Sequence, residues 1–317
     1  ATNNIVFASD DKQIVSYDPS TLQYGEAQTI LTNTSSTAGS TYSETASFSV
    51  TDDLIAAAQS ESVKDGRFST TYNSYLKVLS AEDGSEVNSV LIRTSDSQDS
   101  FDDPQTQFLS NGSVVLFDQS NGINNSNAGT APILYIVSPE TGDFSTVSLS
   151  GHDGLSTNGA EIVELANGNL LVAYNLDAQY TSDPEQLRAS IVSQDGQILV
   201  EDADLLPSGS NSPDVVVEID ALPSGGFVVA SENALQFFDA FGAAVDEPVS
   251  LDSDLHDDFS GVIVDSMSVV DEGFIVVTLS PRTGGGQANS SAIFNFDGEL
   301  VGDPQDLGLT DWGFREY

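Results

Sequence analysis

The chain has 317 residues, and 49 acidic against only 8 basic residues give it a formal net charge of −41. Nucleic acids and anionic lipid surfaces are bound through Lys and Arg, so this charge excludes a nucleic-acid partner and disfavours contact with an anionic membrane. The sequence contains no cysteine, which excludes disulfides, thiolate metal sites and cysteine nucleophiles, and no apolar run is long enough for membrane insertion as a helix.

The first predicted element is the apolar triplet Ile5–Phe7, which fits the second strand of a four-stranded unit. Too few residues precede it to form the first strand of that unit. We expect the missing strand at the other end of the chain, within Thr310–Tyr317. A C-terminal strand that completes the N-terminal unit would close the sheets into a ring and remove exposed edges.

The clearest complete unit lies in the middle of the chain. Asn167-Gly168 and Asp195-Gly196 are expected in tight turns, because Gly and Asn tolerate the positive φ that hairpin turns require. The flanking residues are rich in types that fit a half-buried pleat. The four predicted strands are Glu161–Leu165, Asn169–Tyr174, Leu187–Val192 and Gln197–Val200.

A glycine in the later turn marks each unit, and no segment shows a helical period. Repeats that are each too small to bury a core are typical of solenoids and propellers. We therefore predict an all-β fold, a six-bladed β-propeller of four-stranded antiparallel blades in a single domain, 1–317. An open twisted sheet or a two-sandwich protein is the alternative. The six marker glycines are Gly25, Gly84, Gly142, Gly196, Gly242 and Gly298.

The turn and strand pattern resembles the propeller-like repeats of large secreted, calcium-dependent RTX-type proteins of marine bacteria. The matching stretches include Leu222–Val229 and Leu165–Val172, followed by the Asp-Gly turns that end at Gly196 and Gly298. The resemblance implies a secreted, extracellular module, part of an adhesin or of a modular enzyme. The tandem glycine-rich nonapeptides of that family are absent, so calcium-dependent folding of the β-roll kind is not implied.

The predicted long loops all leave one face of the blades, and the tight turns leave the other. Function is usually carried by loops on a rigid scaffold, so the long-loop face is the predicted binding face. Aromatic rings in these loops suit the C–H faces of sugars, although packing against the scaffold is the alternative for each ring. The predicted ligand-binding residues are Phe101, Tyr180 and Trp312.

Acidic residues end several of the loops that join one blade to the next. If the blades are equivalent, these oxygens surround the mouth of a central channel, and such a ring suits a hard cation such as Ca²⁺. The alternative is that they cap turns by accepting hydrogen bonds from loop amides. The predicted metal ligands are Asp102, Asp103, Asp214, Asp257, Asp258 and Asp311.

No catalytic constellation is identified in the sequence, so no catalytic residues are predicted. His152 and His256 are the two histidines, and no nucleophile elbow for a Ser-His-Asp triad occurs. We therefore expect a non-catalytic binding or adhesion module that recognises a glycan or another cell-surface molecule, supported by Ca²⁺. The alternative is a polysaccharide lyase or glycoside hydrolase with its site at the channel mouth.

Overall fold

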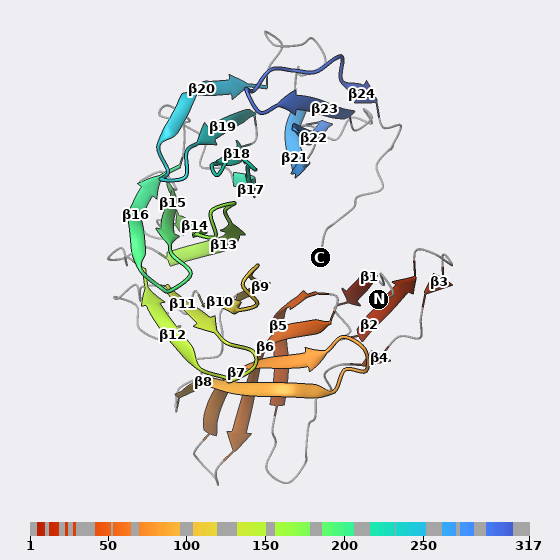
Figure 1. The fold of residues 1–317 in the computed structure, drawn as a ribbon, viewed down its shortest axis with the longest axis vertical. Helices are drawn as coiled ribbons and strands as arrows, with labels where there is room; N and C mark the ends of the chain where they lie inside the picture. The colour runs from red at the N-terminus through yellow and green to blue at the C-terminus, as the bar shows by residue number, and fades with distance from the viewer. Residues whose placement is uncertain are drawn as a thin grey trace. The chain divides into compact units, whose positions relative to one another are not determined.

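The computed structural model consists of β-strands joined by turns and loops (Figure 1). It contains no helix long and apolar enough to cross a membrane within the residues it describes. The described residues are 5–9, 13–18, 23–24, 28–29, 42–51, 53–64, 70–95, 104–118, 132–149, 156–177, 186–205, 216–231, 233–251, 262–270, 273–281 and 290–306.

These residues form six antiparallel sheets of four strands each. The first three sheets are made by β1 (Ile5–Ser9), β2 (Gln13–Asp18), β3 (Gln23–Tyr24) and β4 (Gln28–Thr29); by β5 (Tyr42–Val50), β6 (Leu54–Lys64), β7 (Thr70–Ser80) and β8 (Glu86–Ser95); and by β9 (Gln105–Phe108), β10 (Val114–Asp118), β11 (Ile133–Val137) and β12 (Phe144–Ser148).

The other three sheets are made by β13 (Ser156–Glu164), β14 (Leu170–Asp177), β15 (Gln186–Val192) and β16 (Ile198–Asp204); by β17 (Val216–Ala221), β18 (Phe227–Ser231), β19 (Ala234–Phe238) and β20 (Ala244–Ser250); and by β21 (Val262–Val270), β22 (Phe274–Pro281), β23 (Ser290–Asn295) and β24 (Gln305–Asp306). The strands of the last five sheets follow one another in chain order. The predicted all-β class and the four-stranded antiparallel unit are confirmed.

The second and third strands of the third and fifth sheets are mostly buried, whereas the fourth is largely exposed. All five residues of β10 are buried, but only one residue of β12 is. Strands read as unbroken apolar runs when both of their faces are covered. Within each unit, neighbouring sheets that share an apolar cluster therefore pack face to face.

The first sheet differs from the others, because β2 pairs with both β3 and β4. The chain passes from β2 to β3 through residues 19–22, since Asp18 pairs with Gln23. Gly25, which is predicted to mark the turn of this unit, lies outside the described residues.

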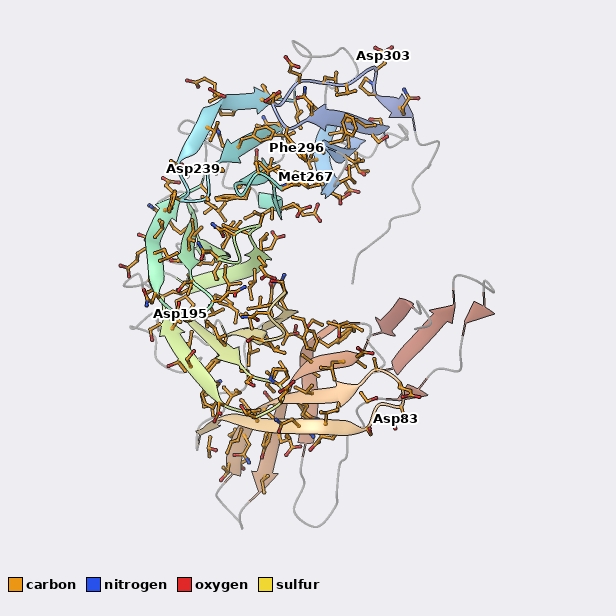
Figure 2. The ribbon with its side chains drawn as sticks, viewed as in Figure 1. Asp83, Asp195, Asp239, Met267, Phe296 and Asp303 are labelled. Atoms are coloured by element: carbon orange, nitrogen blue, oxygen red, sulfur yellow. The ribbon has the colours of Figure 1, made fainter. Side chains whose placement is uncertain are left out.

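The other five marker glycines lie in the predicted turns, and all have positive φ. Each turn is also fixed by a side chain at the end of the third strand. Figure 2 labels one of them, Asp239, whose Oδ1 accepts hydrogen bonds from the amides of Phe241 (2.8 Å) and Ala243 (2.9 Å). A short polar side chain that bonds its own backbone in this way stabilises a turn. The corresponding residues of the other turns are Ser80, Ser138, Ser193 and Asn295.

Two fourth strands, β16 and β20, each contain a shift in pairing register at an aspartate with positive φ. Asp202 in β16 has φ 57° and Asp246 in β20 has φ 59°. Both stand where the pairing with the third strand shifts register. Gln236 supports the second irregularity from β19, because its Nε2 donates to the carbonyl oxygens of Val245 and Asp246, each at 3.3 Å.

The chain divides into two compact units, residues 1–162 and 163–317. In the first unit, Leu76 and Val90 of the second sheet pack against Val114 and Leu116 of the third. In the second unit, one apolar cluster joins β14 and β15 to β18, and another joins β18 and β19 to β22. Closure of the six sheets into one propeller stays a prediction, since Thr310–Tyr317 lies outside the described residues.

Candidate functional site

Each of the last five sheets has two different ends. The connections between first and second strands, and between third and fourth strands, are tight turns at one end, which we call the turn end. By the antiparallel strand order, the connections between sheets and between second and third strands leave the opposite end, the loop end. Except at 65–69, between β6 and β7, and at 232–233, where β18 meets β19, these connections are the long ones. They include 96–103, 119–131, 178–185, 206–215, 252–261 and 282–289.

Every predicted ligand-binding or metal-binding residue belongs to the loop-end connections or to the chain after β24. All nine lie outside the described residues, and so do His152 and His256, so their roles stay predictions. Within the residues that are described, no group of three or more His, Asp or Glu side chains is placed to hold a metal ion. The nine are Phe101, Asp102, Asp103, Tyr180, Asp214, Asp257, Asp258, Asp311 and Trp312.

The described part of the loop end contains a buried ion pair in the first unit. Arg93 Nη1 of β8 lies 3.0 Å from Asp118 Oδ2, the last residue of β10. The Asp118 side chain is fully buried and that of Arg93 is 22% exposed. The pair joins the second sheet to the third, and in the sequence Arg93 and Asp118 lie just before connections 96–103 and 119–131.

A β-bulge brings Arg93 to this position. Ser74 of β7 pairs with Arg93 and Tyr75 pairs with Leu91, so Ile92 is an extra residue in β8. Without this insertion, alternation of side chains would turn Arg93 away from the face that carries Val90. With it, Arg93 reaches the carboxylate on the neighbouring sheet.

Tyr135 completes this cluster on the third sheet. Burial raises the pKa of its hydroxyl, the Asp118 carboxylate raises it further, and the Arg93 guanidinium acts in the opposite direction. Tyr135 thus stays a neutral group beside a charged pair. Its ring also makes an edge-on contact with Phe144, with centroids 6.0 Å apart.

The second unit has a different polar group at the same place in its sheet. Tyr174 is the fifth residue of β14, as Asp118 is of β10, and it is fully buried. Burial raises the pKa of Tyr174, an effect that the adjacent Ser190 hydroxyl opposes. Arg188, which pairs with Tyr174 on β15, lies with Nε 3.9 Å from Asp202 Oδ1.

The burial of these polar residues was missed in the sequence, which indicates a long loop starting at Asp118 and a half-buried strand ending at Tyr174. The available signal was a polar residue in the fifth position after the first tight turn. Gln59, only 3% exposed, occupies the corresponding position in β6.

Each basic side chain that the structure describes lies beside a carboxylate. Lys77 Nζ is 3.6 Å from Glu86 and 3.9 Å from Glu61, while Arg93 and Arg188 face Asp118 and Asp202. These Lys and Arg side chains lie beside carboxylates of the protein itself, so their positive charges offset part of its large negative charge.

No family model matches the chain, and no curated protein matches it. Among solved structures, an apocarotenoid oxygenase variant from Synechocystis is 10% identical, with 96% of this chain and 70% of that chain covered and a TM-score of 0.49. A GH93 α-L-arabinofuranosidase of Fusarium graminearum is 11% identical, with 90% and 85% covered and a TM-score of 0.49. A gluconolactonase from Xanthomonas campestris is 11% identical, with 89% and 80% covered and a TM-score of 0.41. Likeness at this level assigns no activity to the chain.

Proposed function

We propose that the chain is a secreted, non-catalytic extracellular module that binds a glycan or another cell-surface molecule through its loop end. The observation that carries the proposal is the separation of the two ends of each sheet. Tight turns, fixed by glycines and capping side chains, occupy one end, and the long connections occupy the other. Variable loops on a rigid scaffold are the usual place for recognition.

The residues of the loop-end connections favour sugars over other ligands. Phe101, Tyr180 and Trp312 can offer ring faces to sugar C–H groups, as aromatic residues commonly do in binding sites. Charge favours a neutral glycan. The net charge of −41 would repel an anionic glycan. The described cations face carboxylates of the protein itself, so they are not placed to offset this repulsion.

Ca²⁺ is the cofactor we propose, because carboxylates are concentrated in the same connections. Asp257 and Asp258 are adjacent in 252–261, and Asp102 and Asp103 are adjacent in 96–103. Ca²⁺ accepts six to eight oxygen ligands in flexible geometry, so paired loop carboxylates suit it. The ion would also bridge an anionic glycan to the acidic surface.

The scaffold in this proposal is a six-bladed propeller closed by Thr310–Tyr317. Closure would hold the loop ends of all six sheets on one surface, and it would place Asp311 and Trp312 among the other predicted ligand-binding residues. An adhesin-like extracellular module, as the RTX-type resemblance implies, would use this surface to recognise a partner molecule.

A glycan array, probed with the protein in Ca²⁺ and again in a chelator, tests the proposal. We expect binding to one glycan class in Ca²⁺, with binding of any anionic glycan lost in chelator. Each bound glycan is then incubated with the protein and its products are analysed. Recovery of the intact glycan supports a binding module. Shortened or unsaturated sugars among the products would instead indicate that the protein is a hydrolase or a lyase. Absence of binding to the whole array would contradict glycan recognition.

A further inference from the structure

The second unit holds its last two sheets together through carboxylates that bond to the edge of a strand. Asp220 Oδ2 of β17 accepts a hydrogen bond from the backbone amide of Val269 in β21 at 2.8 Å. Glu218 Oε2, two residues earlier on β17, accepts one from the amide of Met267. Figure 2 shows Met267 on β21. Side chains thus occupy the positions that backbone carbonyls of a neighbouring strand would take.

The spacing of the two bonds follows from strand geometry. Side chains at i and i+2 of a strand lie on one face, and amides at i and i+2 point to the same edge. Glu218 and Asp220 therefore match Met267 and Val269 residue for residue. β21 is an edge strand of its sheet, on the side opposite the fourth strand, since within the described residues it pairs only with β22.

The first unit repeats the same contact with an uncharged group. Ser47 Oγ of β5 accepts a hydrogen bond from the amide of Thr106 in β9 at 3.2 Å. Ser47 and Glu218 stand at equivalent positions of their strands. Ser47 comes four residues before Thr51, and Glu218 comes four residues before Leu222; Thr51 and Leu222 open the first tight turns of their sheets. A polar residue recurs at that position in five sheets: Ser47, Gln105, Glu161, Glu218 and Ser266.

We propose that Glu218 and Asp220 guard the edge of β21, by keeping its amides bonded and closed to strand addition from a second copy of this chain. An unpaired strand edge is a template for intermolecular pairing, and natural proteins protect such edges with charged side chains. Two carboxylates are well suited to this, because charge-assisted hydrogen bonds are stronger than neutral ones. The inference does not depend on the proposed ligand.

Amide hydrogen exchange, followed residue by residue by NMR on the full chain, tests whether Glu218 and Asp220 protect the amides of β21. Asp220→Ala should speed exchange of the Val269 amide roughly ten- to a hundredfold, and Glu218→Ala should do the same at Met267, with little effect on the other amide. Glu218→Gln and Asp220→Asn keep an acceptor oxygen and should stay near the wild-type rates. The control Glu247→Ala/Asp297→Ala removes two exposed charges of the same unit and should change neither amide.

The double variant Glu218→Ala/Asp220→Ala should also associate more than the wild type as concentration rises, as measured by light scattering, while the control should behave as the wild type does. Ser47→Ala provides an independent test in the first unit, where exchange at Thr106 should rise. Unchanged exchange at Met267 and Val269 would overturn the proposal. Equal acceleration throughout the β21–β24 sheet would also overturn it, because that result indicates general destabilisation. A double variant with open amides that associates no more than the wild type would overturn the guarding role.

Discussion

Arg93 and Asp118 connect two sheets of the first unit through a contact of 3.0 Å between Nη1 and Oδ2, with the carboxylate fully buried. Arg93→Met should destabilise the fold by about 3–5 kcal/mol, because it leaves a buried charge without its partner. The double variant Arg93→Met/Asp118→Leu should recover most of that loss. Denaturant unfolding of the three proteins measures both effects.

Lys77→Met is the matched control for this ion pair. Lys77 lies near Glu61 and Glu86, whose side chains are 26% and 51% exposed. Solvent-exposed pairs are generally worth about 0–1 kcal/mol, so this variant should unfold close to the wild type. Equal losses for Arg93→Met and Lys77→Met would contradict a special role for the buried pair.

Asp246 is exposed and has φ 59°, a conformation that costs an L-residue about 1–2 kcal/mol. Asp246→Gly should therefore leave stability unchanged or raise it slightly, since glycine reaches positive φ without a steric penalty. Asp246→Val should lower stability, because a β-branched side chain is poorly tolerated there. Thermal unfolding measures the order Gly ≥ Asp > Val, and a valine variant as stable as the glycine variant would contradict it.

The repeat, its turns and its strands could be predicted because they depend on local pattern. Gly84, Gly142, Gly196, Gly242 and Gly298 all adopt the positive φ that their turns require. Gly25 lies outside the described residues, so its place in a turn stays a prediction.

The supports between sheets could not be predicted, because they join residues far apart in the chain. The Arg93–Asp118 contact depends on an extra residue, Ile92, whose bulge is visible only in the pairing of β7 with β8. The bonds from β17 to β21 likewise depend on how two sheets pack. The predicted ligand residues belong to long connections, where strand periodicity gives no information.

Millimolar Ca²⁺ should raise the melting temperature beyond the effect of NaCl at equal ionic strength. A ligand that binds only the folded state stabilises it by mass action, about 2.7 kcal/mol at a hundred times its Kd. Asp257→Asn/Asp258→Asn should abolish the extra shift. The control Asp143→Asn/Asp297→Asn, which removes two charges from the turn end, should keep it. Equal shifts with both salts would indicate charge screening alone.

Deletion of 311–317 should lower the melting temperature sharply, because it removes the strand that we propose to complete the N-terminal sheet. Deletion of residues 1–4, which removes the other terminus but no predicted strand, should have little effect. Scanning calorimetry of the two truncations measures the difference. An unchanged melting curve after the C-terminal deletion would contradict ring closure.

Ligand binding by the loop end, and not by the turn end, is tested by calorimetric titration of the best glycan from the array into Trp312→Ala and Phe241→Ala. Phe241 is the matched control, since it is an aromatic residue of a turn-end hairpin and is 66% exposed. We expect at least tenfold weaker binding for Trp312→Ala, about 1.4 kcal/mol, and wild-type affinity for Phe241→Ala. Wild-type affinity for Trp312→Ala together with weakened binding for Phe241→Ala would show that the turn end binds the ligand.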